Sequence, residues 1–181
     1  MRVTSAVWPL VLLFLTGCTT TSFKPEVAQR PPAEAATIAV GPITAKDEEM
    51  WHGYAVMIRR GLAEQLTKLR GADRVVLLAP GASLPNGMTI SGELTELEKG
   101  DIALRWIIGF GAGQARATSR FQVADPAGVV LARFTTSKAY SGGAGMGGAD
   151  LLDADDLARQ LGEKAGDAID GWLKNGTLPA Y

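Results

Sequence analysis

The sequence predicts an α/β fold of two layers, in which a mixed, mostly antiparallel sheet carries two helices on one face. Two long segments have apolar residues at spacings of three and four, and the region between them alternates like strands. Glycine- and proline-containing turns separate these segments. Of 181 residues, 46% are hydrophobic and 20% are charged, which is enough apolar material for one core. Packing both helical stripes on one sheet face is the simplest way to bury them.

The first predicted elements are a strand, a helix and a second strand. Residues 37–40 are β-prone and end at Gly41-Pro42. The helix ends at Gly71, with acidic residues at its start and basic residues in its later part, as the helix dipole favours. The run 74–78 is apolar on both faces, which predicts a central strand. The apolar stripe of the helix comprises Trp51, Tyr54, Ile58, Leu62, Leu66 and Leu69.

The second half is predicted to contain a series of strands and a final helix. From Met88 the chain alternates, with further strands predicted at 102–110, 115–123 and 129–137. A hairpin loop at 125–128 precedes the last of these strands. The final helix has Asp153, Asp155 and Asp156 at its start and an apolar stripe of Leu157, Leu161, Ala165, Ala168, Ile169 and Trp172.

Residues 1–17 have the pattern of an export signal. Arg2 precedes an apolar run at residues 6–15, which is shorter than the roughly 20 residues of a membrane-spanning helix. The run ends in Leu15-Thr16-Gly17-Cys18, a sequence that resembles the lipobox of bacterial lipoproteins. This resemblance implies cleavage before Cys18, diacylglycerol on its thiol and a palmitate-type chain on its amine. Thr19 after the cysteine implies the outer membrane in a Gram-negative cell. The lipobox residues are Leu15, Thr16 and Gly17, followed by Cys18.

The mature chain is predicted to begin with a tether. Residues 18–35 contain threonines, three prolines and mixed charges, which is typical of a flexible segment that holds a domain off the bilayer. An ordered edge segment packed on the domain is the alternative. We expect residues 36–175 to form a single α/β domain and residues 176–181 to form a C-terminal tail.

Composition excludes several kinds of chemistry. The net charge is −1, so no basic surplus is available to neutralise a nucleic acid. One cysteine and one histidine exclude an intrachain disulfide framework and metal sites built from several thiolates or imidazoles. His52 follows Glu48 and Glu49 within one helical turn, but no nucleophile is marked nearby, which favours a solvated histidine. We therefore expect no enzyme activity, no cofactor and no metal.

Two glycine-rich segments resemble functional motifs. Residues 143–148 match the G-x-G-x-x-G dinucleotide fingerprint, but no second strand follows to complete the βαβ unit, which favours a connector. Residues 109–113 are predicted to form a tight turn or bulge or a place where backbones approach closely. The functional alternative is the tip of an apolar hairpin that could enter a membrane or contact a neighbouring subunit. The residues of this candidate interaction hairpin are Trp106, Ile108, Gly109, Phe110, Gly111 and Gly113.

Three segments resemble a family of bacterial lipoproteins of unknown function. They are the SGELTE strand within residues 90–96, the GFGAG stretch within 104–113 and the hairpin at 125–132. The family hairpin has threonine where this chain has Ala127. A more distant resemblance is to the curli-secretion channel lipoprotein family, whose inserted hairpins build a multi-subunit barrel.

These resemblances imply a lipoprotein held on the outer membrane through Cys18, with its domain in the periplasm. We expect it to act by non-catalytic binding in outer-membrane or surface-structure assembly, with protein partners or as a homo-oligomer. A subunit of an oligomeric export channel is the alternative, and a small hydrolase is the least favoured one. The resemblance implies no reaction.

Overall fold

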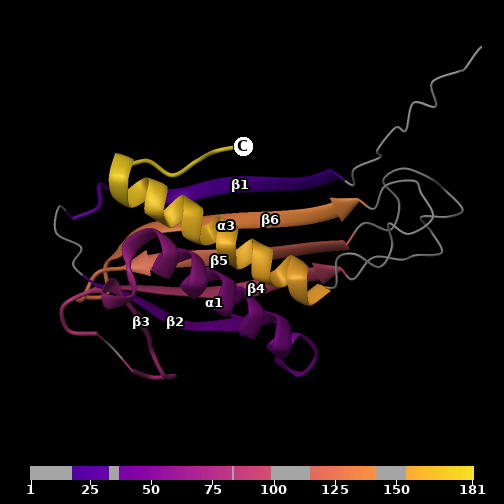
Figure 1. Cartoon of the computed structure of the whole chain (residues 1–181), viewed down its shortest axis with the longest axis horizontal. Coiled ribbons are helices and arrows are strands. Elements are labelled where there is room, and N and C mark those ends of the chain that lie inside the picture. Colours follow the sequence, from indigo (N-terminus) through magenta and orange to yellow (C-terminus); the bar gives the residue numbers. More distant parts are fainter. Residues whose placement is uncertain (1–17, 33–36, 83, 99–114, 142–153) are drawn as a thin grey trace, which may run out of the picture.

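The computed structural model describes residues 18–32, 37–82, 84–98, 115–141 and 154–181. They form one open six-stranded sheet of order β1-β6-β5-β4-β2-β3, with helices α1 (Glu48–Arg70) and α3 (Ala154–Asn175) side by side on one face (Figure 1). This arrangement confirms the predicted fold class.

The sheet combines an antiparallel part with a parallel part. Strands β1, β6, β5 and β4 pair antiparallel in that order, while β2 is parallel to both β4 and β3. A short 3₁₀ helix, Ala72–Arg74, precedes β3. The predicted strand at 102–110 lies outside the described residues. The strands are β1 (Cys18–Ala28), β2 (Ile38–Ala45), β3 (Val75–Leu77), β4 (Met88–Glu98), β5 (Ala115–Ala124) and β6 (Val130–Ser141).

The core lies between the sheet and the two helices. All six residues of the predicted stripe in α3 are buried. Alternate residues of the strands point at the helices, and Phe121 of β5 stacks on Phe134 of β6 with ring centroids 5.4 Å apart. Phe134 also stacks on Phe23 of β1 at 4.6 Å. A row of aromatic rings therefore joins three neighbouring strands.

The two helices approach each other closely at glycines. A Cβ atom on Gly162 of α3 would clash with the carbonyl oxygen of Ile58 in α1, and one on Gly61 would clash with the carbonyl oxygen of Arg159. These neighbours are backbone atoms of a helix, so they cannot move aside as the end of a flexible side chain does. The close helix pair thus depends on the absence of side chains at both positions.

The expectation of a flexible tether is wrong for residues Cys18–Ala28, which form β1 at one edge of the sheet. They pair with β6 along the strand, and Phe23 is buried in the core. The segment after β1 is also held, because the indole N–H of Trp172 donates to the carbonyl of Gln29 at 2.9 Å. The alternative, an ordered edge segment, is what the structure shows.

The other edge of β1 contacts the C-terminal segment. Tyr181 donates its N–H to the carbonyl of Phe23 at 3.2 Å and accepts the N–H of Phe23 at 2.6 Å. The rings of the two residues lie 6.2 Å apart. The predicted tail at 176–181 therefore reaches β1 and adds backbone pairing at the edge that β6 leaves free.

The prediction of a central strand at 74–78 is wrong, because β3 is a three-residue strand at the sheet edge, next to β2. Its Val76 and Leu77 are 38% and 60% exposed. An apolar run has the same sequence pattern whether the strand is buried on both faces or lies at the edge of the sheet. The guanidinium of Arg59 in α1 donates to the carbonyls of Val40 in β2 and Leu78 just after β3. These bonds connect α1 to the edge of the sheet.

Strand β2 runs further than predicted. Gly41-Pro42 was expected to end it, but the strand continues to Ala45 through a break in register between Val40 and Ile43. The proline, which has no N–H to donate, sits within this irregular stretch. A proline therefore interrupts the ladder here without ending the strand.

Candidate functional site

Cys18 lies at an end of the sheet where several strands begin or stop. It is the first residue of β1, and its ladder partner is the last residue of β6. The start of β5, the end of β4 and the N-terminus of α3 lie at the same end (Figure 1). We call this region the Cys18 end. Its ladder pairs are Cys18–Ser141, Ala115–Tyr140 and Glu98–Arg116.

The other predicted site residues lie outside the described residues. These are the lipobox residues Leu15, Thr16 and Gly17 and the candidate interaction hairpin around Trp106, Ile108 and Phe110. The structure nevertheless places both boundaries of the hairpin segment. The chain leaves the sheet at Glu98 and returns at Ala115, both at the Cys18 end.

The histidine–carboxylate pair lies at the start of α1. His52 Nδ1 is 3.4 Å from Glu48 Oε2, and both side chains are more than half exposed. The second oxygen of Glu48 accepts the backbone N–H of Ala45 at 2.9 Å. This bond, followed by the interaction with His52, lowers the pKa of Glu48. The pair thus joins the end of β2 to the first turn of the helix.

Asp47 completes this helix start as an N-cap. Its Oδ1 accepts the N–H of Met50 at 3.1 Å. Within the described ranges, no group of three or more His, Cys, Asp or Glu side chains is arranged to hold a metal ion. The titratable groups at this corner therefore have a structural explanation.

The sheet face opposite the helices is polar. No described helix covers it, and its side chains from β1, β4, β5 and β6 bond to one another across the strands. The bonds are Arg120 Nε to Glu26 Oε1 (3.3 Å), Thr135 Oγ1 to Glu26 Oε1 (2.9 Å), Thr118 Oγ1 to Glu96 Oε2 (3.0 Å) and the Thr118–Ser137 hydroxyl pair (2.9 Å). This network gives the uncovered face a fixed pattern of hydrogen-bonding groups.

Residues 21–144 match a family described as a domain of unknown function, DUF4410. The chain belongs to the DUF4410 family. The matched region of this DUF4410 protein begins within β1 and ends just beyond β6. Helix α3, which supplies half of the helical layer, lies outside it.

No curated protein sequence matches this DUF4410 chain. Among solved structures, two PelC dodecamers from Paraburkholderia phytofirmans, one of a single-substitution variant, each align with a TM-score of 0.44. The variant is 17% identical and covers 82% of this chain and 95% of its own; the other is 13% identical and covers 80% and 96%. A candidate lipoprotein from Caulobacter crescentus CB15 aligns with a TM-score of 0.41 and 14% identity, covering 79% and 95%.

A shallow cavity of about 320 Å³ lies between α3 and the C-terminal segment of the DUF4410 protein. Its ammonium and carboxylate groups pair with each other, since Lys164 Nζ lies 3.1 Å from Asp167 Oδ2. Asp167 also accepts the side-chain amide of Gln65 at 2.5 Å. Asp167 therefore links α3 to α1, and its pairing with Lys164 leaves the cavity without a net charge from these two groups.

Lys138, to which no sequence motif points, is 5% exposed on the helix-covered face of β6. Its ladder neighbours are Thr21 in β1 and Ala117 in β5, and neither carries a charge. Burial lowers the pKa of Lys138, the charge of Lys164 lowers it further, and Glu163 opposes both. The strand alternation could have revealed this residue, because position 138 falls on the buried face.

We expect Lys138→Met to raise the free energy of unfolding at pH 7 by about 1 kcal/mol, since it removes a poorly paired buried charge. The folded state binds this proton less readily than the unfolded chain does. The destabilisation of the folded state by the charged Lys138 is therefore present at neutral pH. It disappears as the pH rises from the lowered pKa of Lys138 to the ordinary lysine value of 10.5. Urea unfolding from pH 7 to 11 measures it, with exposed Lys68→Met as the control. A gain that does not change with pH would contradict this cause.

Proposed function

We propose that the protein is a lipid-anchored lipoprotein of the bacterial cell envelope. Acyl chains on Cys18 hold it on the outer membrane, with the domain in the periplasm. The observation that carries this proposal is the place of Cys18, because the residue that the lipobox marks for modification is also the first residue of β1. Two or more acyl chains give stable anchoring at about 0.8 kcal/mol per buried CH₂. None of the described helices is long and apolar enough to cross a bilayer.

The protein acts, in this proposal, by non-catalytic binding in the assembly of the outer membrane or of a surface structure. Two features of the described residues support binding over catalysis. The exposed His52–Glu48 pair serves the start of α1, and the polar side chains of the uncovered sheet face are engaged with one another. Such a surface can present hydrogen-bonding groups to a partner without activating any of them.

Replacing Cys18 with alanine tests the anchor. We expect Cys18→Ala, expressed with residues 1–17 replaced by a leader whose cleavage does not need the cysteine, to lack acyl chains and to move from the membrane fraction to the soluble periplasmic fraction. The fold should persist, because the β1–β6 ladder is formed by backbone groups. Mass spectrometry of the purified protein and cell fractionation measure the two effects. Thr20→Ala, an exposed change in the same strand, should leave the protein acylated and in the membrane fraction.

Two results would overturn the proposal. One is native protein whose residue 18 carries no lipid or still has residues 1–17 attached. The other is a Cys18→Ala variant that sediments with membranes as completely as the wild type does. Circular dichroism of the variant separates loss of the anchor from loss of the fold.

A further inference from the structure

Cys18 is joined to the folded domain without a spacer. The ladder between β1 and β6 begins at Cys18 itself, opposite Ser141. A strand advances about 3.3 Å per residue, so Ala28 at the other end of β1 lies about 33 Å away. An acylated residue 18 would therefore hold one end of the sheet at the bilayer and would restrict how the domain can turn.

The chain outside the described residues leaves from and returns to the same end. Residues 99–114 join Glu98 to Ala115, and residues 142–153 join Ser141 to the first turn of α3. Both connecting segments thus begin at the Cys18 end of the sheet.

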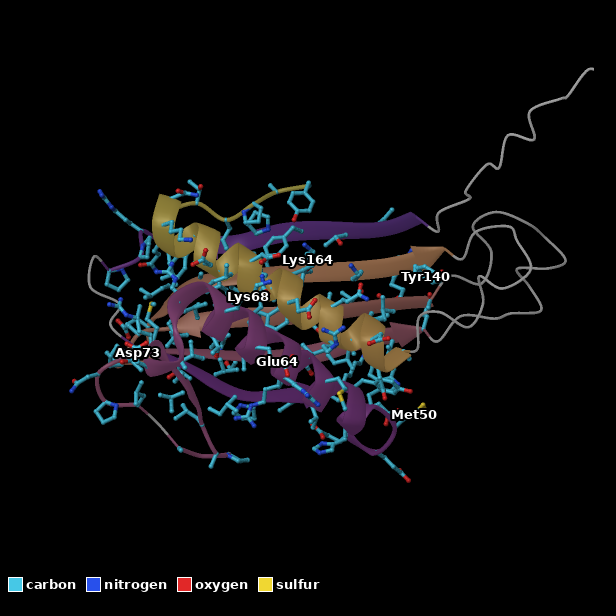
Figure 2. The ribbon with its side chains drawn as sticks, viewed as in Figure 1. Met50, Glu64, Lys68, Asp73, Tyr140 and Lys164 are labelled. Carbon is cyan, nitrogen blue, oxygen red and sulfur yellow. The ribbon has the colours of Figure 1, made fainter. Side chains whose placement is uncertain are left out.

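We propose that the domain stands end-on, with the Cys18 end against the zwitterionic phospholipid surface; this inference rests on the proposed function. The 3₁₀ helix before β3 then points away from the bilayer. Figure 2 shows Met50 and Tyr140 at the membrane-facing end and Asp73 at the opposite end. Met50 is 62% exposed, so its side chain is available to the lipid headgroups.

The charges at this end agree with a zwitterionic surface. The first turns of the two helices are acidic, whereas exposed Arg116 of β5 and exposed Lys46, two residues before α1, supply positive charges. Carboxylates can face the ammonium groups of zwitterionic headgroups but are repelled by anionic lipid. The acyl chains therefore supply the affinity, and the sheet geometry supplies the orientation. The acidic residues are Glu48, Glu49, Asp155 and Asp156.

Single-cysteine labelling tests the orientation. With its thiol acylated, Cys18 leaves an introduced cysteine as the reactive one in the chain, since the sequence has a single cysteine. The full lipoprotein carrying Met50→Cys or Asp73→Cys is labelled with a fluorophore and placed in phosphatidylcholine vesicles that contain a headgroup nitroxide quencher. We expect the probe at position 50 to be quenched several-fold more than the probe at position 73. Anionic lipid should not increase the amount of protein bound.

A linker variant tests whether the missing spacer causes the orientation. Ten Gly/Ser residues inserted between Cys18 and Thr19 would span about 17 Å and let the domain turn. We expect this variant to float with the vesicles while the quenching ratio between the two positions falls toward one. The uninserted protein floating with equal quenching at both positions would overturn the orientation alone. Failure of the uninserted protein to float would overturn the proposed function and the orientation together.

Discussion

Gly162→Ala is expected to lower the free energy of unfolding by about 3–4 kcal/mol and the melting temperature by about 10 °C. The added methyl group would meet the carbonyl oxygen of Ile58 and lie 2.8 Å from the backbone nitrogen of Leu62. Both are backbone atoms of α1, so relief requires the two helices to move apart. Separation would loosen the packing of buried residues such as Leu161. Urea unfolding monitored by circular dichroism measures the loss.

A second glycine in the same helix provides the control. Nothing lies within 4 Å of a Cβ atom built on Gly171, so Gly171→Ala meets no clash. Alanine is favoured over glycine in a helix by about 1 kcal/mol, and this variant should therefore gain stability. A Gly162→Ala protein as stable as Gly171→Ala would show that the close approach of the helices is not required.

Phe23→Ala is expected to cost about 3–5 kcal/mol of folding stability. Phe23 is 3% exposed, and its ring stacks on Phe134. The alanine variant would leave a cavity beside Phe134 and loosen the edge strand. A residue in a flexible tether would show no such effect, so this substitution distinguishes the strand from the tether.

The neighbouring residue is the matched control for this prediction. Lys24 lies in the same strand with an exposed side chain, and Lys24→Ala should change stability by less than about 0.5 kcal/mol. Hydrogen exchange provides a second measurement, because Phe23→Ala should speed exchange in β1 and at its partners in β6. Equal stability of the two variants would mean that β1 contributes nothing to the core.

The helices could be predicted from sequence because their information is local. In α3, apolar residues recur over several turns, so one missing residue does not erase the pattern. The hairpin at 125–128 is also local: Gly128 has a φ of 83°, and its N–H bonds to the carbonyl of Asp125. Turn residues of this kind predict the backbone conformation from residue type alone.

The edge strands could not be predicted, because their partners are distant in the sequence. Among the β1 residues whose burial the structure describes, Phe23 is the buried one, and the polar residues around it resemble a linker. At β3, the run Val75–Leu77 resembles a buried strand, and its edge position depends on sheet order. The lipobox identified Cys18, but a local motif cannot show that the same residue opens a strand.

The pairing of β1 with β6 also bears on the order of events in the lipid attachment proposed above. The Thr136 hydroxyl bonds to the carbonyl of Ser22, 114 positions earlier, so this edge closes only after most of the chain is present. Contacts between such distant positions form late, because a large loop must close first. Until that pairing forms, residue 18 has no ladder partner, so in the proposed lipoprotein it would be accessible to an acyltransferase and a processing peptidase. Pairing of β1 with β6 would then follow lipid attachment.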